Sequence, residues 1–417
     1  MRWTNALRCN IALSSLLAFS SCGGDDKSTG ADMDTAPVKI GLLTTLSGAL
    51  SRWAPSHRAT AQMALSEIND AGGVLGRKVE LVVADSGTDP DQAVLSARAL
   101  IDQGVAVILG PVISSATLKV AREVAIAQDI PLISPTSTSS EISALEDNNL
   151  VWRTAASDLV KAKVAAEVAF DSGARRAGII FIDNSFGIGL ADEFTTQFVS
   201  LGGEVINLIA YPELSGNEIE NYDYRAHVNL VMNNEPDLVY LISFADDGDK
   251  IAIAADGLVS ADYRPQFLVE LPPSVESLSQ IGIYEGLLGI EQQAPASANH
   301  RLFLSNYIAQ YDSEPVLFAD ALYDAFYLAA LAIQQAGSTE GSKIAAQLHG
   351  VSTAGTPVNV DEYARALELL DQGIDIDYEG ASGSIEFDTR GDVSTATYRV
   401  WRVENGAFVD VKTVSFP

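Results

Sequence analysis

The segment between residues 105 and 141 constrains the fold of this chain most, because it alternates strand-like and helix-like patterns. It begins with Val105–Leu109, a short apolar run rich in β-branched side chains, which predicts a buried strand. Apolar residues at helical spacing predict a helix over residues 116–128, and residues 130–134 again have the pattern of a buried strand. Strand, helix and strand in this order predict a βαβ unit with two parallel strands.

Hydroxyl side chains follow both strands of this unit. The first loop reads Val-Ile-Ser-Ser at residues 112–115, and the second reads Thr-Ser-Thr-Ser-Ser at residues 136–140. Because both loops follow parallel strands, they meet at the carboxyl edge of the sheet, where open α/β sheets bind ligands. The first loop also enters a helix, whose free N–H groups favour an anion. The loops therefore suit a small carboxylate held by hydrogen bonds. Alternatively, Ser114, Ser115 and Ser140 only cap helices.

Strands and helices alternate along the rest of the chain, which predicts the α/β class with doubly wound parallel sheets. Because 417 residues exceed one ordinary core, we expect two lobes. Before residue 152, strands are also expected at Val38–Thr44 and 78–85, with helices at 56–71 and 89–103. The pattern then restarts, with strands expected at 177–182, 204–210, 237–243 and 266–269 and helices at 157–171, 190–201, 224–233 and 250–258.

The last third of the chain has a different order of elements. Helical patterns are found at residues 300–311, 318–336, 340–349 and 363–370. Alternating residues then predict strands at 384–387, 397–403 and 408–414. Asn405-Gly406 between the last two is typical of a tight hairpin turn, so these two strands are expected to pair.

Composition excludes several classes of function. A formal net charge of −29 argues against nucleic acid and anionic membrane surfaces as partners, since binding them needs a basic face. No metal site is expected, because Cys9 and Cys22 lie near the N-terminus and the four histidines show no ligand spacing. Gly187-Ile188-Gly189 lacks the third glycine of a dinucleotide-binding loop, and no P-loop or nucleophile elbow occurs. We expect no cofactor and no enzymatic activity, although a Ser-His-Asp triad would leave no local motif.

The first 37 residues are typical of an export signal and a tether. Arg2 and Arg8 precede a short apolar run at residues 11–19, which is too short to span a bilayer. Small residues directly before Cys22 resemble a bacterial lipobox, which implies a signal peptide of residues 1–21 and lipid attachment at Cys22. The small, polar residues that follow suit a flexible tether over residues 22–37. The alternative is an ordinary secretory signal in which the cysteine has no role.

Several passages together resemble the extracytoplasmic substrate-binding proteins of branched-chain amino acid (Leu/Ile/Val-type) ABC transporters. They are VKIGLLTTLSG at 38–48, INDAGGVLGRKVELVVAD at 68–85, DPDQAVLSARALI at 89–101, LGPVISSAT with IPLISPTSTSSE, and the C-terminal RGDVSTATYRVWRVENGAF. Their order and spacing cover essentially the whole chain from about residue 38. The resemblance implies the type I periplasmic binding protein fold.

This resemblance implies two lobes that are joined by a three-strand hinge and close on a ligand. It assigns residues 38–157 plus 290–388 to the first lobe and 158–289 plus 389–417 to the second. The expected partners are a small-molecule ligand and an ABC permease. The chain is expected to be a monomer that touches the membrane only through its lipid anchor, in the periplasm or at the cell surface.

The resemblance also implies ligand-binding residues in the two hydroxyl loops. Ser114 falls where the family binds the carboxylate of the ligand, with Ser115 beside it in the same loop. Ser137 and Thr138 fall on the partner loop. These four residues are the expected polar contacts in the first lobe.

Aromatic residues and one acid complete the expected site. Trp53 and Phe244 fall where aromatic side chains line the family's pocket, although both could simply pack in the core. Phe186 falls where many amino-acid binders have a tyrosine. Glu270 falls near an acid that receives the ligand's ammonium group, and a buried acid here needs a partner. Arg264 or solvent is the alternative partner of Glu270.

The ligand class stays open between two groups. Asp183, Asp246 and Asp247 are rival acids for an ammonium group, and Phe186 lacks the hydroxyl that would help to hold one. Carboxylate binding is therefore better supported than α-amino binding. An amino acid is the first expectation, followed by an aliphatic or aromatic carboxylate or an amide. A lipid-anchored sensor or interaction protein with the same fold is the alternative function.

Overall fold

The computed structural model describes residues 36–214, 217–273, 275–278 and 282–416. Residues 36–417 form one compact unit. The expected signal peptide, the expected lipid attachment at Cys22 and nearly all of the expected tether fall outside the described residues. Within the described part of the chain, no helix is long and apolar enough to cross a membrane.

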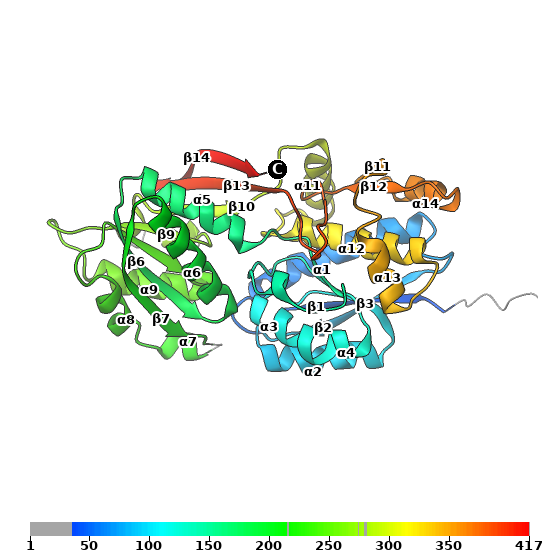
Figure 1. The fold of residues 1–417 in the computed structure, drawn as a ribbon, viewed down its shortest axis with the longest axis horizontal. Coiled ribbons are helices and arrows are strands. Elements are labelled where there is room, and N and C mark those ends of the chain that lie inside the picture. The colour runs from blue at the N-terminus through cyan, green and yellow to red at the C-terminus, as the bar shows by residue number, and fades with distance from the viewer. Residues whose placement is uncertain (1–35, 215–216, 274, 279–281, 417) are drawn as a thin grey trace, which may run out of the picture. The chain divides into compact units, whose positions relative to one another are not determined.

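The first sheet has five parallel strands in the order β2-β1-β3-β4-β5. Figure 1 shows α2 and α3 on one side of this sheet and α12 and α13 on the other. The strands are β1 (Val38–Thr44), β2 (Val79–Asp85), β3 (Val105–Leu109), β4 (Leu132–Ser134) and β5 (Val151–Arg153). The helices between them are α1 (Ala54–Asp70), α2 (Pro90–Asp102), α3 (Ser114–Val120) and α4 (Ile126–Gln128).

The helix after β3 begins two residues earlier than the sequence predicts. It starts at Ser114, continues from α3 through a π-helical turn over Ala121–Ala125, and ends with α4. Ile113 occupies the N-cap position and makes no side-chain capping bond, so neither Ser114 nor Ser115 is the N-cap of α3. In contrast, α2 begins as expected, with Asp89 accepting a hydrogen bond from the Gln92 N–H.

The second sheet has seven strands in the order β14-β13-β10-β9-β8-β6-β7. Five of them are parallel, whereas β13 pairs antiparallel with both β10 and β14. The strands are β6 (Arg176–Asp183), β7 (Glu204–Pro212), β8 (Leu238–Ile242), β9 (Gln266–Val269), β10 (Leu288–Gln292), β13 (Ala396–Glu404) and β14 (Ala407–Phe416). The helices are α5 (Asp158–Asp171), α6 (Ser185–Ser200), α7 (Asn217–Asn221), α8 (Arg225–Val231), α9 (Ala245–Asp256) and α10 (Val275–Leu278).

Alternate residues of the central strand β6 face opposite layers of helices. Ile179 and Phe181 pack with apolar residues of α5 and α6, whereas Ile180 and Ile182 pack with residues of α8 and α9. This period of two is what a strand covered on both faces requires. The doubly wound α/β architecture expected from the sequence is therefore confirmed, with an antiparallel hairpin added at one edge.

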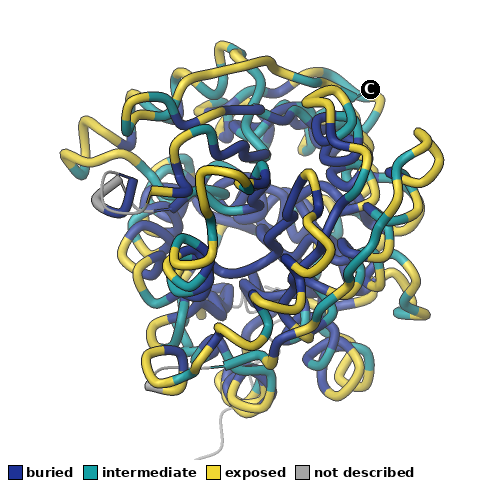
Figure 2. The backbone as a smooth tube through the Cα atoms, turned by 90° about the vertical axis from the view of Figure 1, so that its left-hand side faces the viewer, coloured by how far each residue is buried: buried dark blue, intermediate teal, exposed yellow. Residues whose placement is uncertain are grey.

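The remaining elements pack on the first sheet. They are α11 (Ala298–Tyr311), α12 (Ala319–Ala336), α13 (Gly341–Leu348) and α14 (Tyr363–Asp371), with a small parallel pair of strands, β11 (Thr356–Asn359) and β12 (Ile376–Glu379). Nearly every residue of α12 is buried, because α1, α13 and the sheet surround it. In Figure 2 the exposed backbone lies mostly in peripheral loops. The prediction of a strand at 384–387 is wrong, since that segment makes only isolated β-bridges and joins no sheet.

The chain passes from one sheet to the other three times. The crossovers lie between β5 and α5, between β10 and α11, and between β12 and β13. The first two are linked, because the Ala156 N–H donates to the Gln292 side chain at 3.1 Å. Gln292 ends β10, a strand that the sequence did not predict. The three crossovers confirm the expected three-strand hinge.

Candidate functional site

The two hydroxyl loops lie together at the carboxyl edge of the first sheet. The Ser114 hydroxyl accepts a hydrogen bond from the Ser139 N–H at 3.2 Å, which ties the start of α3 to the second loop. Gly110, which precedes the first loop, passes close to β1, since its φ is +106° and a Cβ there would lie 2.1 Å from the Leu43 carbonyl oxygen. The edge therefore presents hydroxyl groups on backbone that hydrogen bonds hold in place.

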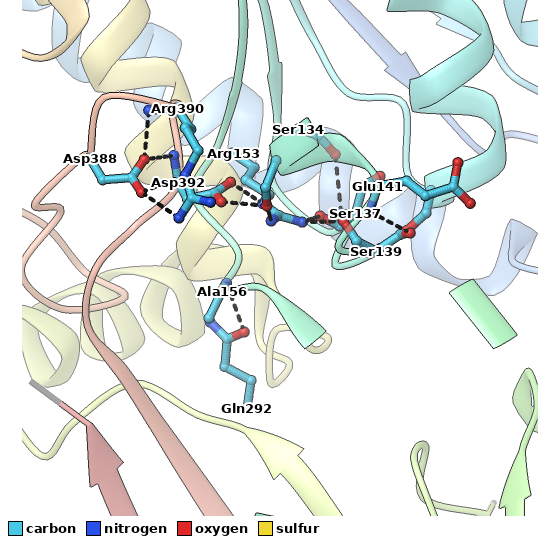
Figure 3. Close-up of polar contacts among 12 residues, drawn as sticks. Ser134, Ser137, Ser139, Glu141, Arg153, Ala156, Gln292, Asp388, Arg390 and Asp392 are labelled. Carbon is cyan, nitrogen blue, oxygen red and sulfur yellow. Dashed lines mark hydrogen bonds and ion pairs between the residues drawn. The ribbon is translucent and has the colours of Figure 1, made fainter. Parts of the chain in front are cut away.

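Arg153 holds the second hydroxyl loop through its guanidinium group (Figure 3). Its guanidinium donates to the carbonyl oxygens of Ser139 at 2.8 Å and Ser137 at 3.3 Å. The same group pairs with Asp392 in the third crossover at 2.6 Å, and both side chains are buried. A single buried cation thus joins the loop to the hinge. Arg153 was not among the site residues predicted from the sequence, although a charged residue that ends an apolar strand is the signal that could have revealed it.

A small cavity of about 50 Å³ opens where these loops face the second sheet. Five of the expected site residues line it together: Trp53, Ser114, Thr138, Phe186 and Phe244. The other lining residues are Leu50, Val112, Ile113, Thr136, Lys161, Leu271 and Phe318.

Two phenylalanines from the second sheet form one wall of the cavity. The Phe186 and Phe244 rings are parallel within 4°, and their centroids are 6.1 Å apart. Phe186 lies in the first turn of α6, where the Asn184 side chain caps the helix. Phe244 directly precedes α9. Both rings therefore sit at the carboxyl edge of the second sheet, on elements that follow β6 and β8.

Three expected site residues do not line the cavity. The Ser137 hydroxyl instead lies 2.8 Å from the Thr117 hydroxyl, inside the first lobe. Ser115 also lies outside the lining. Glu270 follows β9 directly, but its carboxylate is fully buried behind Lys161 and forms an ion pair with that residue.

The partners of Glu270 differ from the three expected from the sequence, which were a ligand ammonium group, Arg264 and solvent. The Tyr240 hydroxyl donates to its carboxylate, and the Lys161 ammonium group forms the ion pair. Arg264 donates instead to the Gly282 carbonyl oxygen. Burial alone would lower the pKa of Lys161, but Glu270 and Asp158 raise it, so the ammonium form is favoured. Lys161 was not predicted as a site residue, although a lysine on the buried face of a predicted helix could have revealed it.

Asp158 adds a second buried acid to this group. It begins α5, its side chain is buried, and neither carboxylate oxygen makes a hydrogen bond of regular geometry within the described residues. Burial raises its pKa to about 6, although Lys161 acts in the opposite direction. Like Glu270, Asp158 does not line the cavity.

The three rival acids have other surroundings. Asp183 is exposed, and Asp246 lies 3.4 Å from Arg52 at the surface. Asp247 is buried and accepts a hydrogen bond from the Tyr211 hydroxyl at 3.2 Å. Burial raises the pKa of Asp247 to about 7. None of the three lines the cavity. Among the described residues, no group of three or more His, Cys, Asp or Glu side chains could hold a metal ion.

Two α/β lobes joined by three crossovers, with a cavity at their facing carboxyl edges, define the class of hinged ligand-binding proteins. The sequence matches the periplasmic binding protein family over residues 37–368. Because this match covers most of its length, the chain belongs to that family, and the expected resemblance is confirmed.

One named relative is similar in sequence, and two solved structures share the fold. The substrate-binding protein BasB of a chemotactic signal transduction system from Halobacterium salinarum is 26% identical over 364 residues, which are 84% of this chain and 83% of BasB. The leucine-binding protein LivK from Thermotoga maritima superposes with a TM-score of 0.73 at 24% identity, covering 90% of this chain and 98% of LivK. An ABC transporter solute-binding protein from R. palustris in complex with benzoate gives a TM-score of 0.71 at 16% identity, covering 91% and 96%.

Proposed function

We propose that this protein captures a small carboxylate-bearing ligand between its two lobes outside the cytoplasm and delivers it to an ABC permease. One observation carries the proposal: a single cavity joins hydroxyl groups of the first sheet's loops to the aromatic rings of the second sheet's loops. Such a cavity is what a hinged binding protein closes around its ligand. The family's extracytoplasmic location fits this role. We propose no catalytic step.

The proposal includes the organisation of the chain that the sequence predicts. Residues 1–21 would be removed as a signal peptide, and Cys22 would carry the lipid that anchors a monomer to the membrane. Residues 38–157 with 290–388 would move as the first lobe, and residues 158–289 with 389–417 as the second. The tether over residues 22–37 would let the closed form reach a permease in the same membrane.

The recognised group in this proposal is the carboxylate. Ser114 and Thr138 supply neutral hydroxyl donors, and the apolar lining suits the rest of the ligand. LivK is named a leucine-binding protein, and the R. palustris protein holds benzoate, so a carboxylate is common to both ligands. An amino acid is the first ligand to test, and plain carboxylates and amides are the second.

Binding would proceed from the first lobe to the second. The open form holds the carboxylate on Ser114 and Thr138, and the second lobe then brings Phe186 and Phe244 over the ligand. Contacts made only in the closed form shift the population towards it. Water is excluded as the apolar walls meet, which strengthens the hydrogen bonds to the carboxylate.

A sensing role is the second candidate, because BasB is named as part of a chemotactic signal transduction system. In this case the closed form would dock on a membrane receptor in place of a permease. Where a permease gene lies next to the gene for this protein, its deletion separates the two roles. Lost ligand uptake supports delivery, whereas normal uptake with a lost behavioural response supports sensing.

Thermal unfolding against a ligand panel tests the binding proposal. The panel holds the common amino acids, their amides, and aliphatic and aromatic carboxylates. A ligand at about a hundred times its dissociation constant stabilises the folded state by roughly 2.7 kcal/mol, which raises Tm by a few degrees. If no compound of the panel shifts Tm, carboxylate capture is wrong.

The double variant Ser114→Ala with Thr138→Ala tests the site itself. It removes both hydroxyl donors from the cavity and should weaken binding about a hundredfold, at roughly 1.5 kcal/mol for each hydrogen bond to a charged group. Ser115→Ala is the matched control, because Ser115 lies beside Ser114 but outside the cavity. Calorimetric titration of each variant gives the affinity. Unchanged affinity in the double variant would remove these hydroxyls from the site.

A further inference from the structure

Among the described residues that line the cavity, Lys161 is the only charged one. It projects from the first turns of α5 and is 7% exposed. Its ammonium group forms an ion pair with Glu270, whose side chain is completely buried behind it. The other lining residues are apolar or carry hydroxyl groups. Lys161 is therefore the charged group that the described wall of the cavity presents to a ligand.

This arrangement removes the acceptor that an amino acid would need. An α-ammonium group must exchange its hydration for a carboxylate or several carbonyl oxygens when it enters a closed site. The carboxylate of Glu270 already holds the Lys161 ammonium group and the Tyr240 hydroxyl. Asp158 is buried outside the lining. An incoming ammonium group would instead meet a like charge in a site of low dielectric constant.

We propose that Lys161 takes the place of the ligand's ammonium group at Glu270, so that the site selects monocarboxylates with an apolar body and no α-amino group. Aromatic acids, branched aliphatic acids and 2-oxo acids belong to this class. The inference rests on the proposed function and narrows its ligand. Of the two ligand classes left open by the sequence, the inference favours plain carboxylates over amino acids.

The lining supplies a complete set of contacts for such a ligand. An ammonium group has three N–H donors, so Lys161 can pair with Glu270 and still donate to a ligand carboxylate. Ser114 and Thr138 offer hydroxyl donors in the same cavity. Trp53, Phe186 and Phe244 offer aromatic surface for the apolar body. Glu270 holds Lys161 in place, which makes it a positioning residue.

Matched pairs of compounds test the inference on the purified full chain. Calorimetric titration compares leucine with 4-methylpentanoate and 4-methyl-2-oxopentanoate, and phenylalanine with 3-phenylpropanoate. Each acid differs from its amino acid only at the α-carbon, so the comparison isolates the amino group. We expect the preferred acid to bind at least about tenfold more tightly than its amino acid, which corresponds to one lost charge-assisted contact.

Two variants test the role of Lys161 directly. Lys161→Met keeps the length of the side chain, removes its charge, and should weaken binding of the preferred acid about tenfold or more. It also frees Glu270, so binding of the matching amino acid should strengthen. Lys161→Met combined with Glu270→Gln removes both charges of this ion pair and should bind neither compound well. Lys163→Met is the matched control, because Lys163 lies on the exposed face of the same helix.

The outcomes separate this inference from the proposed function. If an amino acid binds more tightly than its acid, the inference is wrong and carboxylate capture stands. The inference is also wrong if both Lys161 variants bind the acid as the original chain does. If no acid and no amino acid binds, the proposed function fails and the inference fails with it.

Discussion

Asp158 places a carboxylate in a buried position without a hydrogen bond of regular geometry among the described residues. Burial raises its pKa to about 6 from 3.8, so the folded chain binds a proton more tightly than the unfolded chain does. The free energy of unfolding therefore falls as the pH rises from about 4 to about 6. Asp158→Asn should raise it by on the order of 2 kcal/mol at pH 7.5, and the gain should vanish near pH 4.

Urea unfolding of Asp158→Asn at these two pH values measures the effect. Asp183→Asn is the control, because Asp183 is exposed at the end of β6 and should show no such gain. An Asp158→Asn chain that is equally or less stable than the original chain at pH 7.5 would contradict the idea that the buried charge costs stability.

At the same scale, the sequence identified the residues that belong to local motifs. Ser114 and Thr138 follow adjacent strands, and Phe186 and Phe244 follow two others, so strand order alone places them at facing edges. Lys161 escaped notice because helical periodicity predicts that its face is buried, but not what it meets there. Its partner Glu270 comes from a distant strand, and this pairing exists only in the folded chain.

At the scale of elements, the buried ion pair between Arg153 and Asp392 stabilises the third crossover. Asp392→Ala leaves the fully buried Arg153 guanidinium without its carboxylate, and breaking such a pair should cost about 3–5 kcal/mol. Because Arg153 also holds the carbonyl oxygens of Ser137 and Ser139, ligand affinity should fall as well. Denaturant unfolding and ligand titration measure the two effects.

Arg390→Ala is the control for this element. Arg390 pairs with Asp388 at 3.2 Å in the same crossover, but it is exposed, and such surface pairs contribute about 1 kcal/mol or less. If Asp392→Ala costs no more than Arg390→Ala, the buried pair does not stabilise the hinge.

Elements with strong local signals were predicted well from the sequence. The Asn405-Gly406 turn joins β13 and β14 as expected, with both residues at positive φ, as a tight hairpin requires. The prediction of a strand at 384–387 failed because alternation of polar and apolar residues also fits a loop packed on the core. The strand β10 was not predicted because its short segment carries no turn signal. Its position in the sheet is set by pairing with β9 and β13, which are distant elements or lie outside its local sequence.

Over the whole molecule, the sequence predicted two α/β lobes, whereas the return of its C-terminal strands to the second sheet came only from family resemblance. Local patterns predict what an element is, but they do not predict which distant element it pairs with. The same limit applies to contacts between the lobes. The Ser139 hydroxyl donates to the Ser185 carbonyl oxygen at 2.9 Å, and Arg52 lies 3.4 Å from Asp246. These contacts hold the two lobes together around the cavity.

Closure of the lobes can be blocked at Gly189, which faces the second hydroxyl loop from α6. A Cβ on Gly189 would lie 3.5 Å from the Ser140 hydroxyl and 3.7 Å from that of Ser139, so a large side chain would keep the lobes apart. Gly189→Trp should fold, weaken ligand binding about a hundredfold because it removes the contacts of the closed form, and keep the ligand-free radius of gyration when ligand is added. Small-angle scattering with and without ligand measures the closure. Asp192→Trp is the control, because Asp192 is exposed on the same helix and should allow closure. If Gly189→Trp binds and closes normally, the proposed mechanism of lobe closure over the loop is wrong.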